Sequence, residues 1–181
     1  MRILISGGAK NGKSDYAQDL AVAMAKGGAR YYVATMLPFD GEDHARIRKH
    51  RESRAGMGFE TVECPRFILS CLEHTHRQGS FLLDSTTALL TNELFSDTVT
   101  FQPDRASAER CCRELVEFAR QVENVVFVSD GIYSDAALYD ETTELFRREL
   151  ARIDRELAKV CDTVIEFSAG IPIIRKGGLP L

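Results

Sequence analysis

A glycine-rich motif near the start of the chain restricts the folds that this sequence can adopt. Residues 7–14 read Gly-Gly-Ala-Lys-Asn-Gly-Lys-Ser, which matches the phosphate-binding template of Gly, four residues, Gly, Lys and then Ser or Thr. The apolar run 2–6 before the motif is typical of a buried parallel strand, and the Ala-rich stretch 15–26 after it favours a helix. The motif is therefore predicted to join a strand to a helix, as a phosphate loop does.

The motif supplies both backbone and side-chain groups for phosphate binding. Its glycines allow successive N–H groups to point at phosphate oxygens, and the start of the following helix adds partial positive charge. Lys13 is expected to contact the β- and γ-phosphates, and the Ser14 hydroxyl is expected to bind Mg²⁺. We therefore predict nucleoside triphosphate binding by Gly7, Gly8, Ala9, Lys10, Asn11, Gly12, Lys13 and Ser14.

Length and composition narrow the class of protein. A chain of 181 residues is expected to form one domain, residues 1–181, with 44% hydrophobic and 28% charged residues as in ordinary soluble proteins. The net charge of −4 argues against a nucleic-acid surface, and no apolar run has membrane-spanning length. Because Met1 leads directly into a strand, without a secretory signal, we expect a cytoplasmic protein. The five cysteines lack CxxC spacing and are expected to be free thiols.

Strand-like and helix-like segments alternate along the chain. Strands are expected at 29–35, 58–64, 80–84, 124–129 and 162–167, and helices at 67–76, 85–95, 106–121 and 141–160. The charged segment 42–55 is predicted to be a solvated helical face, 96–105 to be irregular, and 170–176 to be a terminal extension. This alternation predicts an α/β fold, a three-layer P-loop NTPase-like domain with a mostly parallel central sheet.

Two strand ends are expected close to the phosphate loop, because parallel sheets bind ligands at the carboxyl ends of their strands. Ala34, Thr35 and Met36 end the second predicted strand, and Asp84 closes the apolar strand 80–84. An apolar strand that ends in an acid is the second metal-site element of phosphate-loop proteins. We therefore predict that Asp84 and Ser14 hold Mg²⁺.

A longer set of residues carries a resemblance to a known family. The most specific stretch is Ala45-Arg46-Ile47-Arg48-Lys49-His50-Arg51-Glu52-Ser53-Arg54, after the phosphate loop. Further segments match the same family and follow in the same order along the chain: Thr61-Val62-Glu63, Leu82-Leu83-Asp84, Thr91-Asn92-Glu93-Leu94-Phe95, Phe146-Arg147 and Ala169-Gly170-Ile171-Pro172. Over nearly its whole length the chain resembles the adenosylcobinamide kinase/adenosylcobinamide-phosphate guanylyltransferase family, which assembles the nucleotide loop of cobalamin.

This resemblance implies an enzyme with two activities that uses Mg²⁺. A kinase step uses GTP or ATP to phosphorylate the aminopropanol hydroxyl of adenosylcobinamide. GTP then gives GMP to a histidine with loss of pyrophosphate, and adenosylcobinamide phosphate takes the GMP to form adenosylcobinamide-GDP. His50 matches the histidine that carries GMP, so His50 and Lys13 are the expected catalytic residues, whereas His44 is out of register.

The resemblance also implies the surroundings of that histidine. Further nucleotide-binding residues are expected at Arg51, Glu52, Ser53, Arg54, Glu63 and Asp84. A neutral imidazole is a competent nucleophile near neutral pH, and Arg46, Arg51 and Arg54 would neutralise phosphate charge. The expected partners are a nucleoside triphosphate, an adenosylcobinamide-type corrinoid and further copies of the chain, in a homo-oligomer that the resemblance implies to be a trimer.

Three segments depart from the family pattern. Residues 54–59 lack its Arg-Pro and Trp, Ser129-Asp130-Gly131-Ile132 stands in place of Asn-Glu-Val-Gly, and Asp154-Arg155 stands in place of Asn-Gln. Asp130 offers an acid one methylene shorter, in a loop on the ligand side of the predicted sheet. The open alternatives are a divergent P-loop kinase, a single-activity nucleotidyltransferase on another acceptor, and a GTP-binding regulatory protein that transfers nothing.

Overall fold

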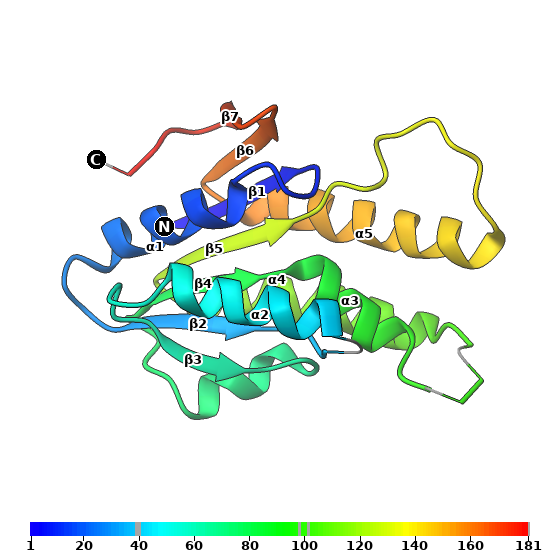
Figure 1. Ribbon diagram of the computed structural model, residues 1–181, viewed down its shortest axis with the longest axis horizontal. Coiled ribbons are helices and arrows are strands. Elements are labelled where there is room, and N and C mark those ends of the chain that lie inside the picture. Colours follow the sequence, from blue (N-terminus) through cyan, green and yellow to red (C-terminus); the bar gives the residue numbers. More distant parts are fainter. Residues whose placement is uncertain (39–40, 98, 101, 181) are drawn as a thin grey trace.

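A seven-stranded sheet forms the middle of the molecule, with helices on both faces (Figure 1). The computed structural model describes residues 1–38, 41–97, 99–100 and 102–180, while the side chains of residues 42, 43, 46, 49 and 50 lie outside the description. The strands are β1 (Arg2–Gly7), β2 (Arg30–Ala34), β3 (Glu60–Glu63), β4 (Ser80–Asp84), β5 (Asn124–Ser129), β6 (Thr163–Ser168) and β7 (Ile171–Lys176).

The order of the strands across the sheet is β3-β2-β4-β5-β1-β6-β7. Strands β1 to β6 pair in parallel, and β7 pairs antiparallel with β6. The mostly parallel α/β fold predicted from the sequence is confirmed. Strand β1, which leads into the phosphate loop, lies between β5 and β6. The loop therefore emerges at the carboxyl ends of the strands, away from both edge strands.

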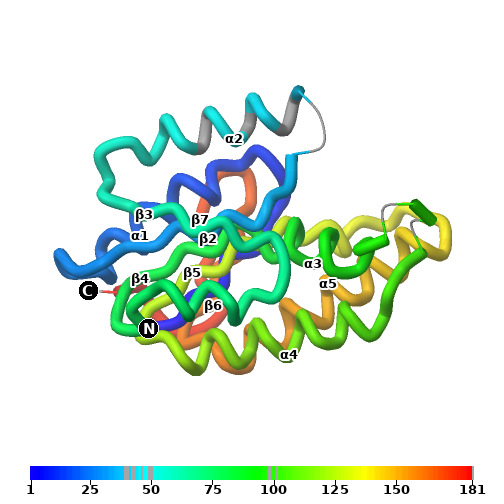
Figure 2. The backbone as a smooth tube through the Cα atoms, turned by 90° about the horizontal axis from the view of Figure 1, so that it is seen from below, coloured from blue at the N-terminus to red at the C-terminus, as the bar shows by residue number. Residues whose placement is uncertain are grey.

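The helices cover the two faces of this sheet, and Figure 2 shows α2 and α4 on opposite sides of it. They are α1 (Lys13–Ala25), α2 (Gly41–Ser53), the 3₁₀ helix η1 (Ile68–Glu73), α3 (Thr86–Leu94), α4 (Arg105–Gln121) and α5 (Glu141–Val160). Ser85, Asp104 and Asp140 begin the last three α-helices by accepting hydrogen bonds from N–H groups of the first turn. No helix in the described ranges combines the length and apolar character needed to cross a bilayer.

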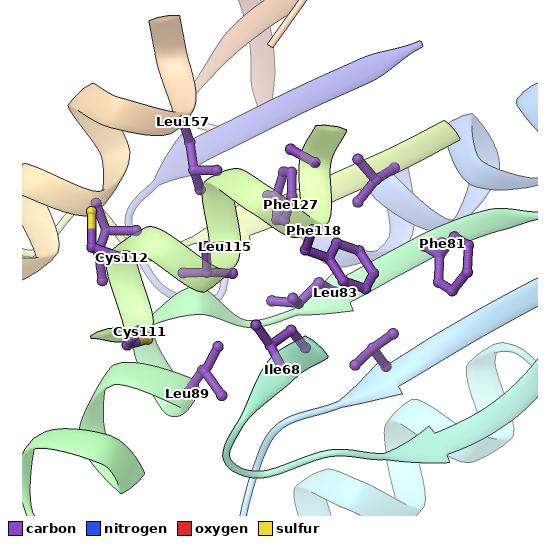
Figure 3. Close-up of a cluster of buried hydrophobic side chains, with 14 of the residues drawn as sticks. Ile68, Phe81, Leu83, Leu89, Cys111, Cys112, Leu115, Phe118, Phe127 and Leu157 are labelled. Atoms are coloured by element: carbon purple, nitrogen blue, oxygen red, sulfur yellow. The ribbon is translucent and has the colours of Figure 1, made fainter. Parts of the chain in front are cut away.

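Successive residues of each strand face opposite sides of the sheet, and this period of two builds two cores. Phe81, Leu83 and Phe127 point toward α3, α4 and α5, where they pack with Phe118 in the larger cluster (Figure 3). The alternate residues pack against α1 in the second cluster, which includes Ile3, Ile5, Leu82, Val126 and Val128. Because central strands are buried on both faces, their sequences are continuous apolar runs.

Two predicted segments differ from the structure. Segment 67–76 forms only the 3₁₀ helix Ile68–Glu73, and segment 170–176 is a seventh strand rather than an extension. Pro172 has no N–H group, but it is tolerated because β7 lies at the edge of the sheet. The charged segment 42–55 forms helix α2 as predicted, and the five cysteines are buried free thiols.

The larger core generates a stability prediction at Phe118. Its ring is fully buried, with centroid distances of 5.4 Å to Phe81 and 6.3 Å to Phe127. Phe118→Ala should lower the free energy of unfolding by about 3–5 kcal/mol, measured by urea denaturation, because it leaves a cavity. The control Val99→Ala, at a side chain that is 86% exposed, should change it by less than about 0.5 kcal/mol. A loss below about 1 kcal/mol for Phe118→Ala would contradict this packing.

Candidate active site

The phosphate loop is fixed by two glycines and one asparagine. Gly12 precedes α1 with φ of 89°, a left-handed conformation that a side chain would strain. A Cβ atom on Gly7 would lie 2.5 Å from the carbonyl oxygen of Phe167, so only glycine fits against β6 there. Asn11 Nδ2 donates to the same carbonyl at 3.2 Å. The loop is therefore fastened to the neighbouring strand.

Lys13 is buried at the start of α1 and has two partners. Its Nζ atom lies 2.7 Å from Asp130 Oδ1 and donates to the carbonyl of Gly8 at 3.1 Å. Asp130 follows β5, and its N–H donates to Thr87 Oγ1 at 3.0 Å. A buried ammonium group is costly unless it is paired, so Asp130 supplies the charge that allows Lys13 to sit inside the loop.

Asp84 is the last residue of β4. It lies two residues after Leu82, which packs in the α1 core, so both side chains face the side of the sheet that carries α1. Its Oδ2 atom accepts a hydrogen bond of 3.1 Å from the Tyr32 hydroxyl. Burial, followed by the negative charge of Asp84, raises the pKa of Tyr32, so the phenol remains the donor. Strand β5 separates Asp84 from β1, as the strand order shows.

Ser14 and Asp84 provide the hard oxygen donors that Mg²⁺ prefers. Ser14 lies in the first turn of α1 and Asp84 at the end of β4, both half-buried. Within the described part of the chain no group of three or more His, Cys, Asp and Glu side chains is placed to hold a metal. A phosphate-loop Mg²⁺ completes its shell with phosphate oxygens and water, so these two residues fit such a site.

The end of α2 is joined to Asp84 through Tyr32. The guanidinium carbon of Arg54 lies 3.8 Å from the centroid of the Tyr32 ring, and its Nη2 donates to Thr61 Oγ1 at 3.3 Å. Arg54 is only 7% exposed, so this cation–π contact is largely withdrawn from water. Gln18 Nε2 reaches Ser53 Oγ at 3.5 Å. The predicted residues 53 and 54 therefore lie on the side of the sheet that carries α1.

Other predicted residues lie where the end of α2 meets β3, a region called here the α2–β3 border. Arg51 and Glu63 form an exposed ion pair of 3.1 Å, and Glu52 is exposed. His50 lies in the last turn of α2, but its side chain, like that of Arg46, lies outside the described residues. The structure therefore brings this part of α2 beside β3.

Thr35 is used inside the protein. It is fully buried, and its hydroxyl donates to the carbonyl of Ser85 at 2.8 Å and accepts from the Ser85 N–H at 2.7 Å. Asn92 Nδ2 donates to the Thr35 carbonyl at 2.7 Å. Ala34 is the partner of Asp84 in the β2–β4 ladder, so the end of β2 lies beside Asp84. Strands β4 and β5 separate it from β1, so the structure does not place it directly beside the phosphate loop as the sequence led us to expect. Thr35 holds the backbone that follows this acid.

Sequence reasoning placed Asp130 on the ligand side of the sheet but did not predict its pairing with Lys13, and it gave Tyr32 no role in the site. The signal for Asp130 was its position directly after a central strand, where parallel sheets place ligand-binding groups. Tyr32 gave no such signal, because an aromatic residue in a strand is usually a packing residue. Its contact with Asp84 depends on strand register.

Asp154 of α5 is a buried acid behind this site. Its Oδ2 atom accepts hydrogen bonds of 2.7 Å from Ser129 Oγ and of 2.7 Å from the Tyr133 hydroxyl. Its Oδ1 atom has no hydrogen-bond partner among the described residues. Burial, partly opposed by these hydrogen bonds, raises the pKa of Asp154 to about 6.

Comparisons with known proteins cover nearly the whole chain. A family model described as cobinamide kinase / cobinamide phosphate guanyltransferase matches residues 3–174. The bifunctional adenosylcobalamin biosynthesis protein CobP of Pseudomonas aeruginosa is 32% identical over 179 residues, 98% of each chain. The bifunctional adenosylcobalamin biosynthesis protein CobU of Salmonella typhimurium is 28% identical over 182 residues, 96% of this chain and 98% of that protein.

A solved structure supports the fold. That structure, the ATPase domain of another protein, resembles the chain with a TM-score of 0.52 and 13% sequence identity, over 99% of this chain and 78% of that one. At this identity the similarity concerns the fold alone.

The Asp154 carboxyl should make stability depend on pH. Its pKa of about 6 lies above the usual 3.8, so between these values the folded state binds more protons than the unfolded state. The free energy of unfolding should therefore lose about 2 kcal/mol as pH rises from 4.5 to 7.5. Asp154→Asn resembles the protonated acid and lacks this loss. The free energy of unfolding of the variant, relative to wild type, should therefore rise by that amount over the same pH range.

Urea denaturation of both proteins at pH 4.5 and pH 7.5 tests this prediction, because a difference between the proteins removes the contribution of other acids. A stability difference that is the same at both pH values would show that Asp154 does not carry a raised pKa.

Proposed function

Because the chain belongs to the cobinamide kinase / cobinamide phosphate guanyltransferase family, we propose that it is an enzyme with both activities. It phosphorylates adenosylcobinamide and then transfers GMP from GTP to adenosylcobinamide phosphate. The phosphate loop at the end of β1, with buried Lys13 at the start of α1, is the observation that carries this proposal. The alternative of a regulatory protein that only binds GTP is not favoured, because the relatives of this chain are named for adenosylcobalamin biosynthesis.

In the kinase step, GTP or ATP lies in the phosphate loop. The N–H groups of Gly7, Gly8, Ala9, Lys10, Asn11, Gly12, Lys13 and Ser14 surround its phosphates. Lys13 moves its ammonium group from Asp130 to the β- and γ-phosphates, whose charge replaces that of the carboxylate. The acceptor hydroxyl attacks the γ-phosphorus, the bond to the β–γ bridging oxygen breaks, and the nucleoside diphosphate leaves.

Ser14 and Asp84 would hold Mg²⁺ in both steps. The ion supplies charge neutralisation for the phosphate oxygens. Tyr32 donates to one oxygen of Asp84 and thereby orients the carboxylate, and Arg54 holds the Tyr32 ring. Residues Ala34, Thr35 and Met36 keep the end of β2 beside this acid.

In the guanylyltransferase step, His50 is the nucleophile. A ring nitrogen of His50 attacks the α-phosphorus of GTP, pyrophosphate leaves, and a phosphorus–nitrogen bond forms. A phosphate oxygen of adenosylcobinamide phosphate then attacks the same phosphorus. The phosphorus–nitrogen bond breaks, which restores the free histidine. The position of His50 in α2, next to the ion pair of Arg51 with Glu63, supports a nucleotide site at the α2–β3 border. Its further members are Glu52, Ser53, Arg54 and Asp84.

We propose in addition that the protein is a homo-oligomer, a trimer as the family resemblance implies, and that it works in the cytoplasm. Strand β7 supports assembly, because an open strand edge with exposed apolar residues favours association. Ile171, Ile174 and Leu179 are the exposed apolar residues in and after this strand. The use of ATP and GTP supports the cytoplasmic location.

The GMP-histidine intermediate gives the sharpest test. Wild-type protein incubated with Mg²⁺ and GTP labelled in the α-phosphate should retain label on denaturing electrophoresis, because a phosphoramidate survives denaturation. The bond should be labile in acid and stable in alkali. His50→Ala should lose the label completely, since no nucleophile remains.

His44→Ala is the matched control, because it makes the same substitution in the same helix at an exposed residue. It should label like wild type. Label that persists in His50→Ala would move the nucleophile to another residue. A folded protein that binds GTP but takes no label would contradict the guanylyltransferase activity.

A further inference from the structure

A cavity of about 760 Å³ lies beside the phosphate loop, on the side away from Asp84. Residues 7–9 of the loop form one wall, and the segment 130–135 after β5 forms the wall opposite. Strands β6 and β7 and the first turns of α5 close the remaining sides, through Glu166, Phe167, Ser168, Arg175, Thr143 and Arg147. The volume is typical of a small-molecule binding site.

The cavity adjoins Lys13 of the phosphate loop through Asp130. Asp130 lines it, and the same carboxylate lies 2.7 Å from Lys13 Nζ. Lys13 is the residue that contacts the β- and γ-phosphates in a phosphate loop. A molecule in the cavity therefore lies next to the phosphate that the kinase step transfers.

The charges that line the cavity do not suit a second nucleotide. Arg147 is paired with Asp135 at 2.8 Å and with Glu144, and Arg175 is paired with Glu166 at 2.6 Å. Every arginine that lines the cavity therefore has a carboxylate partner. A site for a triphosphate needs unpaired cations or a ring of N–H groups, and here the phosphate loop supplies them.

The remaining lining suits a bulky molecule that is mostly uncharged. Aromatic and aliphatic surface comes from Ile132, Tyr133 and Tyr139, and hydroxyl groups come from Ser134, Thr143 and Ser168. Apolar surface with a few hydrogen-bonding groups is the usual lining for an organic ligand. A corrinoid combines these features, since its macrocycle is apolar and its rim carries amides.

The wall opposite the phosphate loop is held in place by one side chain. Arg147 Nη2 donates to the carbonyl of Asp135 at 3.2 Å, Nη1 to that of Ala137 at 3.4 Å, and Nε to that of Ile132 at 3.3 Å. These bonds fasten the segment to α5, although Ile132 and Tyr139 remain 39% and 44% exposed. The cavity is thus formed before any ligand enters it.

We propose that this cavity binds the corrinoid acceptor of the kinase step, with Asp130 as the catalytic residue that accepts the proton of the acceptor hydroxyl. The proposal rests on the function proposed above. The cavity takes the aminopropanol arm and the adjoining edge of the macrocycle. When Lys13 turns to the phosphates, Asp130 takes the hydroxyl proton, the oxygen bonds to the γ-phosphorus, and the nucleoside diphosphate leaves.

Ser168→Tyr tests the binding site, because it places a large ring in the cavity without changing the phosphate loop. The KM for adenosylcobinamide in the kinase step should rise at least about tenfold. The KM for ATP should change less than about twofold, and labelling of His50 by GTP alone should be unchanged. Ser96→Tyr is the control, because it makes the same substitution at an exposed serine outside the cavity lining, and it should leave all three values unchanged.

Two results would overturn the cavity assignment. One is an unchanged KM for adenosylcobinamide in Ser168→Tyr, and the other is a rise in the KM for ATP alone, which would place the nucleoside in the cavity. If wild type neither labels nor phosphorylates, the proposed function itself fails. Calorimetric titration of wild type and Ser168→Tyr with adenosylcobinamide then still decides whether the cavity binds it.

Asp130→Asn tests the proton acceptor. The kcat of the kinase step should fall about 100-fold or more, while calorimetric binding of adenosylcobinamide and GMP labelling of His50 persist. Asp130→Glu should recover most of the rate, because it restores a carboxylate. A kcat for Asp130→Asn within about threefold of wild type would contradict the role, and would leave Asp130 as a partner of Lys13 only.

Discussion

The ion pair between Lys13 and Asp130 is the interaction on which the site depends. Lys13 is almost fully buried, and a buried ammonium group without a partner would destabilise the folded protein. The carboxylate that satisfies it belongs to Asp130, directly after β5, and the backbone N–H of Asp130 donates to the Thr87 hydroxyl of α3. A phosphate that enters the loop must therefore compete with a carboxylate.

The two faces of the sheet divide the work of the site. On the α1 side, Arg54 contacts the Tyr32 ring and Tyr32 donates to Asp84. These contacts fix the orientation of Asp84, the acid expected to face the metal. On the α5 side, Arg147 fastens a loop against α5, and the cavity lies between that loop and the phosphate loop. The phosphate loop lies between these regions because β1 is an interior strand.

Local features of the sequence predicted the fold and the phosphate loop. The motif at residues 7–14 fixes its own conformation, and apolar runs or helical periods mark elements whose burial depends on neighbours of any identity. Contacts that depend on register could not be predicted. The Tyr32–Asp84 bond requires β2 to lie beside β4, and the Lys13–Asp130 pair requires β5 to lie beside β1. Strand β7 was missed because a short exposed edge strand has no buried face to mark it.

The position of β1 has a consequence for how the protein is made. Its ladder partners are residues 125–129 and 163–167, so β1 pairs with strands that are synthesised long after it. Long-range pairing of this kind is slow to form, because a large loop of chain must close before any contact rewards it. During synthesis the apolar run of β1 waits unpaired on the ribosome, exposed to chaperones and proteases. The phosphate loop therefore gains its contacts with β6, through Gly7 and Asn11, only after that strand has joined the sheet.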